Sequence, residues 1–453
     1  MNGVPTTVVC AGCGYEAPPD DLYPFRCPAA RPADDVDHVM VRELDPAHVR
    51  FPEADEANPF VRYRELFHAY HLGRANGMSD ADHVDLVEHL DRAVSEVDGR
   101  GFTVTPFRPA ETLSKRVGCQ VWVKDETANV SGSHKARHLM GLMLHMRVAE
   151  RVAPTPGQAR PDLAIASCGN AALAAATVAR AAGRTLRVFV PTWADAAVLA
   201  RLEALDAKIT VCPREEGVRG DPAYLALRRA LADGAVPFTT QGSDNGLCVE
   251  GGETLGYEMV SELAQAGGGL DRLFVQVGGG ALASACIRAF EDAALLEVPV
   301  ALPRIHAVQT AGAHPLARAH DRVIARLAGD GSPSAAVDAM RYARTHRSEF
   351  MWPWEEEPKS VATGILDDET YDWAAVVGGM VATDGSPVIV SEETLLEAND
   401  VARDATGIDV SHTGSAGLAG LLELARRGEI HEHERVAVLF TGSSATSRGE
   451  NEG

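Results

Sequence analysis

The sequence predicts an α/β protein built on mostly parallel β-sheet. From about residue 100 onward, short apolar runs alternate with helical segments. Such alternation is typical of βαβ units, in which helices cover both faces of a parallel sheet. In these sheets ligands bind beyond the carboxyl ends of the strands. The loops that follow the predicted strands are therefore the first place to look for a site.

The predicted elements follow one another in a simple order. Before residue 100, valines and leucines at helical spacing predict a helix over 84–97, which starts at a capping box formed by Ser79 and Asp82 and stops at Gly99. Strands are expected at 121–126, 163–167, 186–191, 208–213, 272–277, 304–309 and 435–440, and helices at 171–183, 196–207 and 281–290.

Composition and charge exclude several classes of partner. The 453 residues are 45% hydrophobic and 23% charged, which is ordinary for a globular protein, and the formal net charge is −22. A surface of this charge repels nucleic acid and anionic membranes, so neither is expected as a partner. The sequence contains no apolar run long enough to span a bilayer and no signal-peptide pattern at its start, so a cytoplasmic location is expected.

The cysteines are unevenly distributed along the chain. Three of the eight lie near the N-terminus as Cys10-x-x-Cys13 and Cys27, which resembles half of a zinc ribbon plus one further ligand. His38 is the candidate fourth ligand of a structural zinc ion; the alternative is a decayed ribbon with reduced thiols. We expect an N-terminal cap over 1–44, a helical extension over 45–100 and the main region over 101–453.

Four loops after predicted strands carry chemically useful side chains. Lys135 stands behind a Ser-Gly-Ser turn, and a lysine amine forms a Schiff base with an aldehyde. The turn 167–170 offers backbone N–H groups and an amide at a helix start, and the glycines of 278–280 allow close approach to a phosphate. The loop 441–444 adds hydroxyl groups. Taken alone, the glycine loop is as well explained by a tight turn, and the other three are better explained by an ordinary turn or a solvated lysine, but the ordered set is more informative.

The combination resembles the pyridoxal-phosphate enzymes of fold type II, the tryptophan synthase β-like fold, which includes threonine synthase, cysteine synthase and serine/threonine dehydratase. The resemblance covers roughly residues 100–445. It is carried by VKDETANVSGSHKARH, ASCGNAALAAATVARAAG, EGGETLGYE, VGGGALAS, RIHAVQTAGAHPL, TGSAGLAGLL and LFTGSS. It implies two lobes with twisted, mostly parallel sheets, a small lobe at approximately 135–250 inserted in the large one, and a homodimer.

The resemblance also implies roles for individual residues. Lys135 would hold pyridoxal phosphate as a Schiff base and later move the Cα proton of a small amino-acid substrate. Ser167, Cys168 and Gly169 would bind the substrate carboxylate. The remaining cofactor-binding residues implied are His134, Asn170, Gly278, Gly279, Gly280, Ala281, Leu282 and Thr441. Ala281 replaces a glycine that the family usually has, which requires that this residue avoid positive φ.

The expected reaction is β-elimination or β- or γ-replacement, because a hydroxyl group at Thr441 would leave the pyridine nitrogen of the cofactor unprotonated. Features shared with threonine synthases include the N-terminal cysteines and RIHAVQTAGAHPL. The His-Lys pair departs from threonine synthases and is similar to the tryptophan synthase β subunit. A serine/threonine dehydratase or a cysteine synthase type of enzyme therefore remains open, as does a catalytically silent binding protein; a nicotinamide dehydrogenase would leave Lys135 and Thr441 unexplained. Cations that could bind a phosphorylated substrate are Arg137, Lys124 and Arg304.

Overall fold

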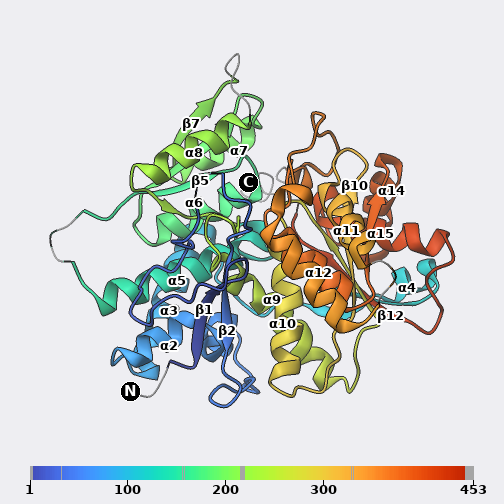
Figure 1. Ribbon diagram of the computed structural model, residues 1–453, viewed down its shortest axis with the longest axis horizontal. Coiled ribbons are helices and arrows are strands. Elements are labelled where there is room, and N and C mark those ends of the chain that lie inside the picture. The colour runs from blue at the N-terminus through green and yellow to red at the C-terminus, as the bar shows by residue number, and fades with distance from the viewer. Residues whose placement is uncertain are drawn as a thin grey trace.

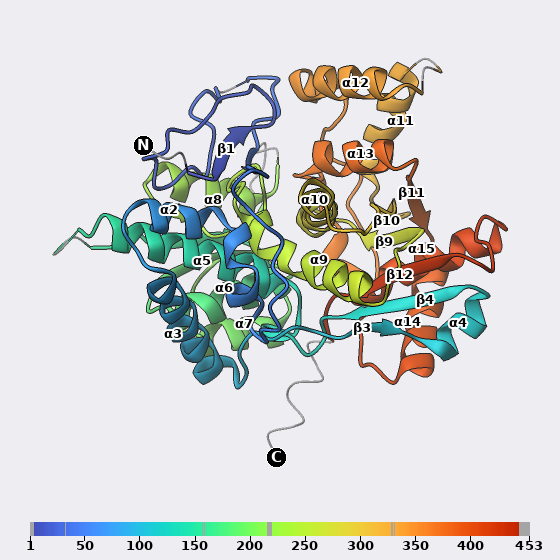
Figure 2. The same ribbon diagram turned by 90° about the horizontal axis from the view of Figure 1, so that it is seen from below.

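The chain folds into an α/β structure (Figures 1 and 2). The computed structural model describes residues 4–31, 33–155, 157, 159–214, 220–327, 329 and 331–443, and within these ranges it has three β-sheets. Two of the sheets are built of parallel strands, with one antiparallel strand at an edge, and they form two lobes. The predicted fold class is confirmed.

The larger sheet has six strands in the order β11-β10-β9-β12-β4-β3. The strands are β3 (Phe107–Pro109), β4 (Gln120–Asp125), β9 (Arg272–Gln276), β10 (Arg304–Thr310), β11 (Ser386–Val390) and β12 (Arg435–Phe440). All neighbours are parallel except the edge strand β3. The position of β9 in the middle of the sheet explains why its centre is apolar. Leu273 and Val275 pack in one cluster with α10 and α13, whereas Phe274 lies in the cluster formed with α15.

The smaller sheet has four parallel strands in the order β7-β6-β5-β8. They are β5 (Leu163–Ala166), β6 (Leu186–Pro191), β7 (Lys208–Cys212) and β8 (Val236–Pro237). This lobe lies at the upper left of Figure 1, apart from the larger sheet. Both sheets point the carboxyl ends of their strands into loops that carry predicted site residues.

The helices cover both sheets and join the lobes. In the N-terminal half they are α1 (Pro59–Arg62), α2 (His68–Ala75), α3 (Asp80–Asp98), α4 (Glu111–Val117), α5 (Lys135–Val152), α6 (Asn170–Ala181), α7 (Ala196–Ala204) and α8 (Pro222–Ala232). In the C-terminal half they are α9 (Cys248–Gln265), α10 (Ala281–Leu295), α11 (Pro315–Leu327), α12 (Pro333–Thr345), α13 (Trp373–Ala382), α14 (Glu392–Thr406) and α15 (His412–Arg426). The predicted capping box of α3 is present at Ser79 and Asp82. Within the part of the chain described here, no helix is both long and apolar enough to cross a membrane.

The N-terminal residues form a small cap around the hairpin β1 (Thr6–Cys10) and β2 (Met40–Leu44). The cap is tied to the main region by a buried arginine on β2. Arg42 donates to Asp292 on α10 at 2.7 Å and also binds Glu250 and Glu253 on α9. Because an uncompensated charge at this depth is costly, these ion pairs fix the cap on the large lobe.

Candidate active site

The turn before Lys135 has an unusual backbone that its neighbours hold in place. Ser131 has a φ of 53° and Gly132 a φ of 72°, so two successive residues are left-handed, a conformation that costs energy for serine. The Ser131 N–H donates to Asp98 at 3.0 Å, and the Gly132 N–H donates to the Asn129 carbonyl at 2.8 Å. Strain of this kind persists where the surroundings impose it, and here it orients the first residue of α5, Lys135.

Lys135 lies in a site where a neutral amine is favoured. Burial lowers the pKa of Lys135, and the negative charges of Asp367 and Asp372 only partly oppose that effect. A lysine with a lowered pKa supplies more of the free amine that reacts with an aldehyde. This is the behaviour that the predicted role of Lys135 requires.

The loop after β12 docks directly on the lysine turn. The Thr441 carbonyl accepts from the His134 N–H at 3.0 Å, and the Ser443 N–H donates to the Gly132 carbonyl at 3.0 Å. The Thr441 side chain is buried, and its Oγ1 accepts from Nε2 of Gln276 at 3.0 Å. That bond leaves the hydroxyl hydrogen of Thr441 available for a further acceptor. Ser444, the last residue of the predicted loop, lies outside the described residues.

The turn of the small lobe meets the same place. Ser167, Cys168, Gly169 and Asn170 are all half-buried at the end of β5 and the start of α6. A Cβ built on Gly442 would lie 3.2 Å from Nδ2 of Asn170, so the predicted amide stands against the loop that holds the lysine turn. Burial raises the pKa of the Cys168 thiol, which argues against an activated nucleophile.

The glycine loop closes the site from the large lobe. Gly278, Gly279 and Gly280 connect β9 to α10, and Gly280 has a φ of 98°. Ala281 is the first residue of the α10 helix, so it avoids positive φ, which is what its replacement of a glycine requires. The free N–H groups of a helix N-terminus favour an anion, and a 15-residue helix supports them here. Leu282 is buried behind them.

A buried histidine nitrogen points to an absent ligand at this loop cluster. His134 is 7% exposed, its Nδ1 lies 3.2 Å from the Thr441 carbonyl, and its Nε2 has no partner among the described residues. Since a carbonyl only accepts, Nδ1 carries the hydrogen and Nε2 is the free acceptor. Burial, reinforced by the neighbouring Lys135, holds the pKa of His134 well below its usual range. An anion such as a phosphate group, bound beside Nε2, would raise the pKa of His134 again and favour a protonated ring that donates to it.

Two carboxylates in the site were not predicted from the sequence. Asp367 and Asp372 belong to the segment before α13, which packs on the glycine loop: a Cβ on Gly278 would collide with Oδ2 of Asp367, and the Asp372 N–H donates to the Gly279 carbonyl at 3.0 Å. Burial raises the pKa of Asp367 to about 6 and that of Asp372 to about 7. The one feature of the sequence that could have indicated them is the acidic run at 367–369, which follows two apolar residues; such a run usually marks a surface loop.

The cations proposed from the sequence for a phosphorylated substrate are engaged elsewhere. Arg137 donates to Glu126 at 2.8 Å and to Glu258 at 2.6 Å in a fully buried cluster. Lys124 binds Glu258 in the same cluster. Arg304 is at the amino end of β10, half-exposed and 3.8 Å from Asp384. None of the three is placed to bind a substrate phosphate at the strand ends.

The four predicted metal ligands come together in the cap. The ligand atoms of Cys10, Cys13, Cys27 and His38 all lie within 4.8 Å of one another. The Cys13 and Cys27 sulfurs are 3.6 Å apart, and the Cys10 sulfur is 3.4 Å from Nδ1 of His38. Tetrahedral zinc with sulfur ligands at about 2.3 Å and a nitrogen ligand at about 2.0 Å places such pairs about 3.8 Å and 3.5 Å apart. Nε2 of His38 faces Asp34 at 3.0 Å, the outer partner that orients a ligating imidazole.

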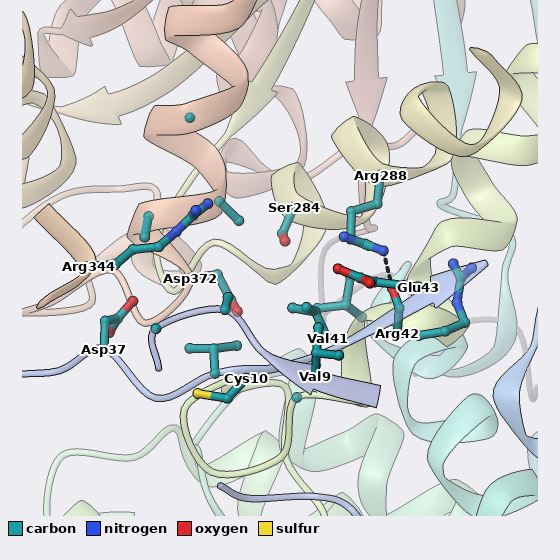
Figure 3. A pocket seen from close by; sticks show the side chains of 18 of the residues that line it. Val9, Cys10, Asp37, Val41, Arg42, Glu43, Ser284, Arg288, Arg344 and Asp372 are labelled. Atoms are coloured by element: carbon teal, nitrogen blue, oxygen red, sulfur yellow. Dashed lines mark hydrogen bonds between the residues drawn. The ribbon is translucent and has the colours of Figure 1, made fainter. Parts of the chain in front are cut away.

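A cavity of about 870 Å³ separates the cap from the large lobe (Figure 3). Its walls come from the cap at Cys10 and Asp37, from α10 at Ser284 and from α12 at Arg344. Asp372 lines it as well, and the same residue bonds the glycine loop. The cavity thus lies beside the glycine loop, with the metal-ligand cluster at its other edge.

Comparison with known proteins agrees with this geometry. Residues 100–442 match the family described as pyridoxal-phosphate dependent enzyme. The chain belongs to this family. A threonine synthase of Bacillus sp. (strain ULM1) is 26% identical over 342 residues, covering 75% of this chain and 82% of the relative. A threonine synthase of Mycobacterium tuberculosis (strain ATCC 25618 / H37Rv) is 26% identical over 340 residues, covering 75% and 81%.

Solved structures place this pyridoxal-phosphate dependent enzyme in fold type II. The processed form of threonine deaminase isoform 2 from Solanum lycopersicum aligns with a TM-score of 0.57 at 17% identity, over 83% of this chain and 94% of that one. Diaminopropionate ammonia lyase from Escherichia coli aligns with a TM-score of 0.58 at 14% identity, over 81% and 90%. Maize serine racemase aligns with a TM-score of 0.57 at 17% identity, over 80% and 93%. These alignments confirm the predicted fold type.

Proposed function

We propose that this enzyme is a pyridoxal-phosphate dependent lyase that catalyses β-elimination, or β- or γ-replacement, on a small amino acid. The observation that carries the proposal is the convergence of four loops on Lys135: the glycine loop, the small-lobe turn, the loop after β12 and the lysine turn itself. Their order and geometry fit one cofactor better than four unrelated turns. The threonine synthase relatives, at 26% identity, support the same class of reaction.

The residues that would hold the cofactor divide by the group they contact. Lys135 would bind the aldehyde carbon, and Asn170 would bond the ring oxygen. The phosphate would be held by backbone N–H groups from Gly278 to Leu282 and by Nε2 of His134, which has no partner among the described residues and would take up a proton in order to donate to the anion. Thr441, with a hydroxyl hydrogen to donate, would face the ring nitrogen. When bound, the cofactor withdraws electrons from the Cα of the substrate.

The protein itself supplies proton transfer and orientation. The lowered pKa of Lys135 suits a base that takes the Cα proton at neutral pH. Ser167, Cys168 and Gly169 would bind the substrate carboxylate at the start of α6. A hydroxyl partner at Thr441, unlike a carboxylate, does not hold a proton on the ring nitrogen, which favours loss of a side-chain group over transamination.

A structural zinc ion in the cap is part of the proposal. The distances among the three cysteine sulfurs and the histidine nitrogen suit tetrahedral zinc, and Asp34 orients His38. The ion would close the cap without taking part in the reaction. We further propose a homodimer and a cytoplasmic location, as the resemblance suggests; sedimentation velocity of the purified protein and fractionation of the producing cell test these two points.

The test is the absorbance spectrum of the protein loaded with pyridoxal phosphate, titrated in turn with serine, threonine, O-acetylserine and O-phosphohomoserine. Wild type should show the visible band of a lysine-bound cofactor and change it with at least one of these. Lys135→Ala should lose that band and all turnover, whereas Lys115→Ala, at an exposed position on α4, should keep both. A Lys135→Ala variant with the wild-type band would refute the assignment. A band without turnover on any amino acid would favour a catalytically silent binding protein.

A further inference from the structure

One acidic side chain in the site has no role in holding the cofactor. Asp367 stands against the glycine loop: a Cβ on Gly278 would collide with its Oδ2, and a Cβ on Gly279 would lie 3.8 Å from the same atom. It also lies within the electrostatic reach of Lys135 and of Cys168 on the opposite lobe. The carboxyl group therefore lies against the glycine loop and within electrostatic range of the Lys135 amine and of the small lobe.

Asp367 differs from the other acid of the same segment. Asp372 is 3% exposed, and its carboxylate packs on Gly242 in the wall of the site. Asp367 remains partly exposed. It is one of several charges there. The groups that act on Asp367 electrostatically are Lys135, Asp368 and Asp221, and it acts in turn on Cys168 and Tyr371.

A phosphate in the cradle forces a protonation state on Asp367. The N–H groups that suit the phosphate belong to the loop against which Asp367 packs, and two anions this close do not both stay ionised. Burial raises the pKa of the Asp367 carboxyl and Lys135 and the Gly279 N–H lower it, whereas a bound phosphate would raise it further, so a larger share of Asp367 would keep its proton. A partly exposed, protonated carboxyl group is a proton donor, and the Lys135 amine within its electrostatic range is a proton acceptor.

We propose that Asp367 is the catalytic acid that protonates the leaving group, and that the substrate is an amino acid with a free hydroxyl or amine on Cβ. The inference rests on the proposed function, which it makes more specific. It separates this chain from an enzyme of phosphorylated amino acids, because the described residues of the site present an acid to the substrate side chain, where a phosphate ester would need cations.

The proton and electron flow is balanced by these two residues. The Cα proton passes to Nζ of Lys135, and the electron pair of the Cβ–O or Cβ–N bond leaves with the heteroatom. The carboxyl proton of Asp367 passes to that atom, so water or ammonia departs. The unsaturated amino acid that is released hydrolyses to a 2-oxo acid and ammonia; serine thus gives pyruvate and ammonia, with one water lost and one regained. Exchange with solvent returns the proton from Lys135 and restores Asp367.

The cations described near the site do not favour a phosphorylated substrate over one with a free hydroxyl or amine. Arg137 and Lys124 are buried in ion pairs, as described above. Arg214, on the small lobe, is exposed and opposes the charge of Asp368, the neighbour of Asp367. Arg214, exposed and already facing a carboxylate, is a poor match for a phosphate dianion.

The test compares leaving groups that differ in their need for a proton. Serine and threonine lose a hydroxyl group and need an acid, whereas β-chloroalanine loses chloride and needs none. Asp367→Asn should lower kcat on serine or threonine by about 100-fold or more and leave β-chloroalanine within a few-fold of wild type. Asp384→Asn removes an exposed charge at the amino end of the large sheet, away from the strand ends that carry the site loops; it is the control and should behave as wild type on both.

A binding measurement gives an independent readout. The affinity of the apo protein for pyridoxal phosphate should fall as pH rises above the Asp367 pKa of about 6, because ionised Asp367 repels the phosphate. Asp367→Asn should weaken that pH dependence, and Asp384→Asn should retain it.

The outcomes separate the two proposals. Equal losses on serine and β-chloroalanine, or turnover of O-phosphohomoserine alone by wild type, would overturn the assignment of Asp367 while the lyase proposal stands. Failure of wild type to bind pyridoxal phosphate would instead refute the proposed function.

Discussion

Removing the Arg137 guanidinium should destabilise the protein without any direct effect on chemistry. Arg137 makes six hydrogen bonds to Glu126, Thr254, Glu258 and Thr105. In Arg137→Met the apolar stem is kept, so cavity formation contributes little. What is lost is the charge, which leaves two buried carboxylates to share the charge of Lys124. Breaking a buried pair in this way costs about 3–5 kcal/mol.

The measurement is the urea midpoint of unfolding, followed by tryptophan fluorescence. Arg151→Met is the matched control: it lies on the same helix α5, but its pair with Asp82 is about half exposed, and such pairs contribute about 0–1 kcal/mol. Arg137→Met should therefore unfold at clearly lower urea than either wild type or the control. Equal midpoints for the two variants would refute the reasoning. Arg137→Lys with wild-type stability but a raised KM for O-phosphohomoserine would restore Arg137 as an anion-binding residue.

Three further changes probe the cradle, the cap and the pH dependence of stability. Gly278→Ala should weaken binding of pyridoxal phosphate by about tenfold or more, because the new Cβ would lie 2.8 Å from the Ile365 Cα and displace the glycine loop. A spectral titration with the cofactor measures this affinity. An unchanged affinity would count against the glycine loop as the phosphate site. Cys13→Ser should lower the zinc content of the purified protein from one ion per chain and lower its melting temperature; loss of neither would show that the cap needs no metal. Burial lowers the pKa of His68 from 6.5 to about 3 in the folded protein. The folded state therefore keeps His68 neutral, and its free energy of unfolding falls as pH drops below 6.5, because only the unfolded state takes up the proton. Near pH 5 the loss is about 2 kcal/mol. His68→Gln should flatten that acid slope in urea unfolding, and a slope as steep as wild type would contradict it.

The sequence predicted those parts of the fold that depend on local pattern. The apolar strand around Phe274 indicated a sheet covered on both faces, and the capping box at Ser79 marked the start of α3, because periodicity and caps are properties of neighbouring residues. The site loops were found because each follows a strand. Asp367 was missed because nothing local distinguishes it from a solvated acid. Its position depends on how the segment before α13 packs against a loop about 90 residues earlier in the chain, and such packing leaves no periodic signal.

The glycine loop shows why its sequence alone was ambiguous between a phosphate cradle and a tight turn. Two separate requirements select glycine there. The Cβ side is filled by protein, since a Cβ at Gly278 would collide with Asp367 and a Cβ at Gly280 would make tight contacts with Thr370 and Asp372. The N–H side belongs to the start of α10, where an anion is favoured. The segment before α13 therefore packs against the glycine loop and orients its N–H groups. Asp367 makes part of this contact, and it is also the residue that we propose lies beside the substrate. A single packing contact would thus shape the proposed phosphate site and place the proposed proton donor.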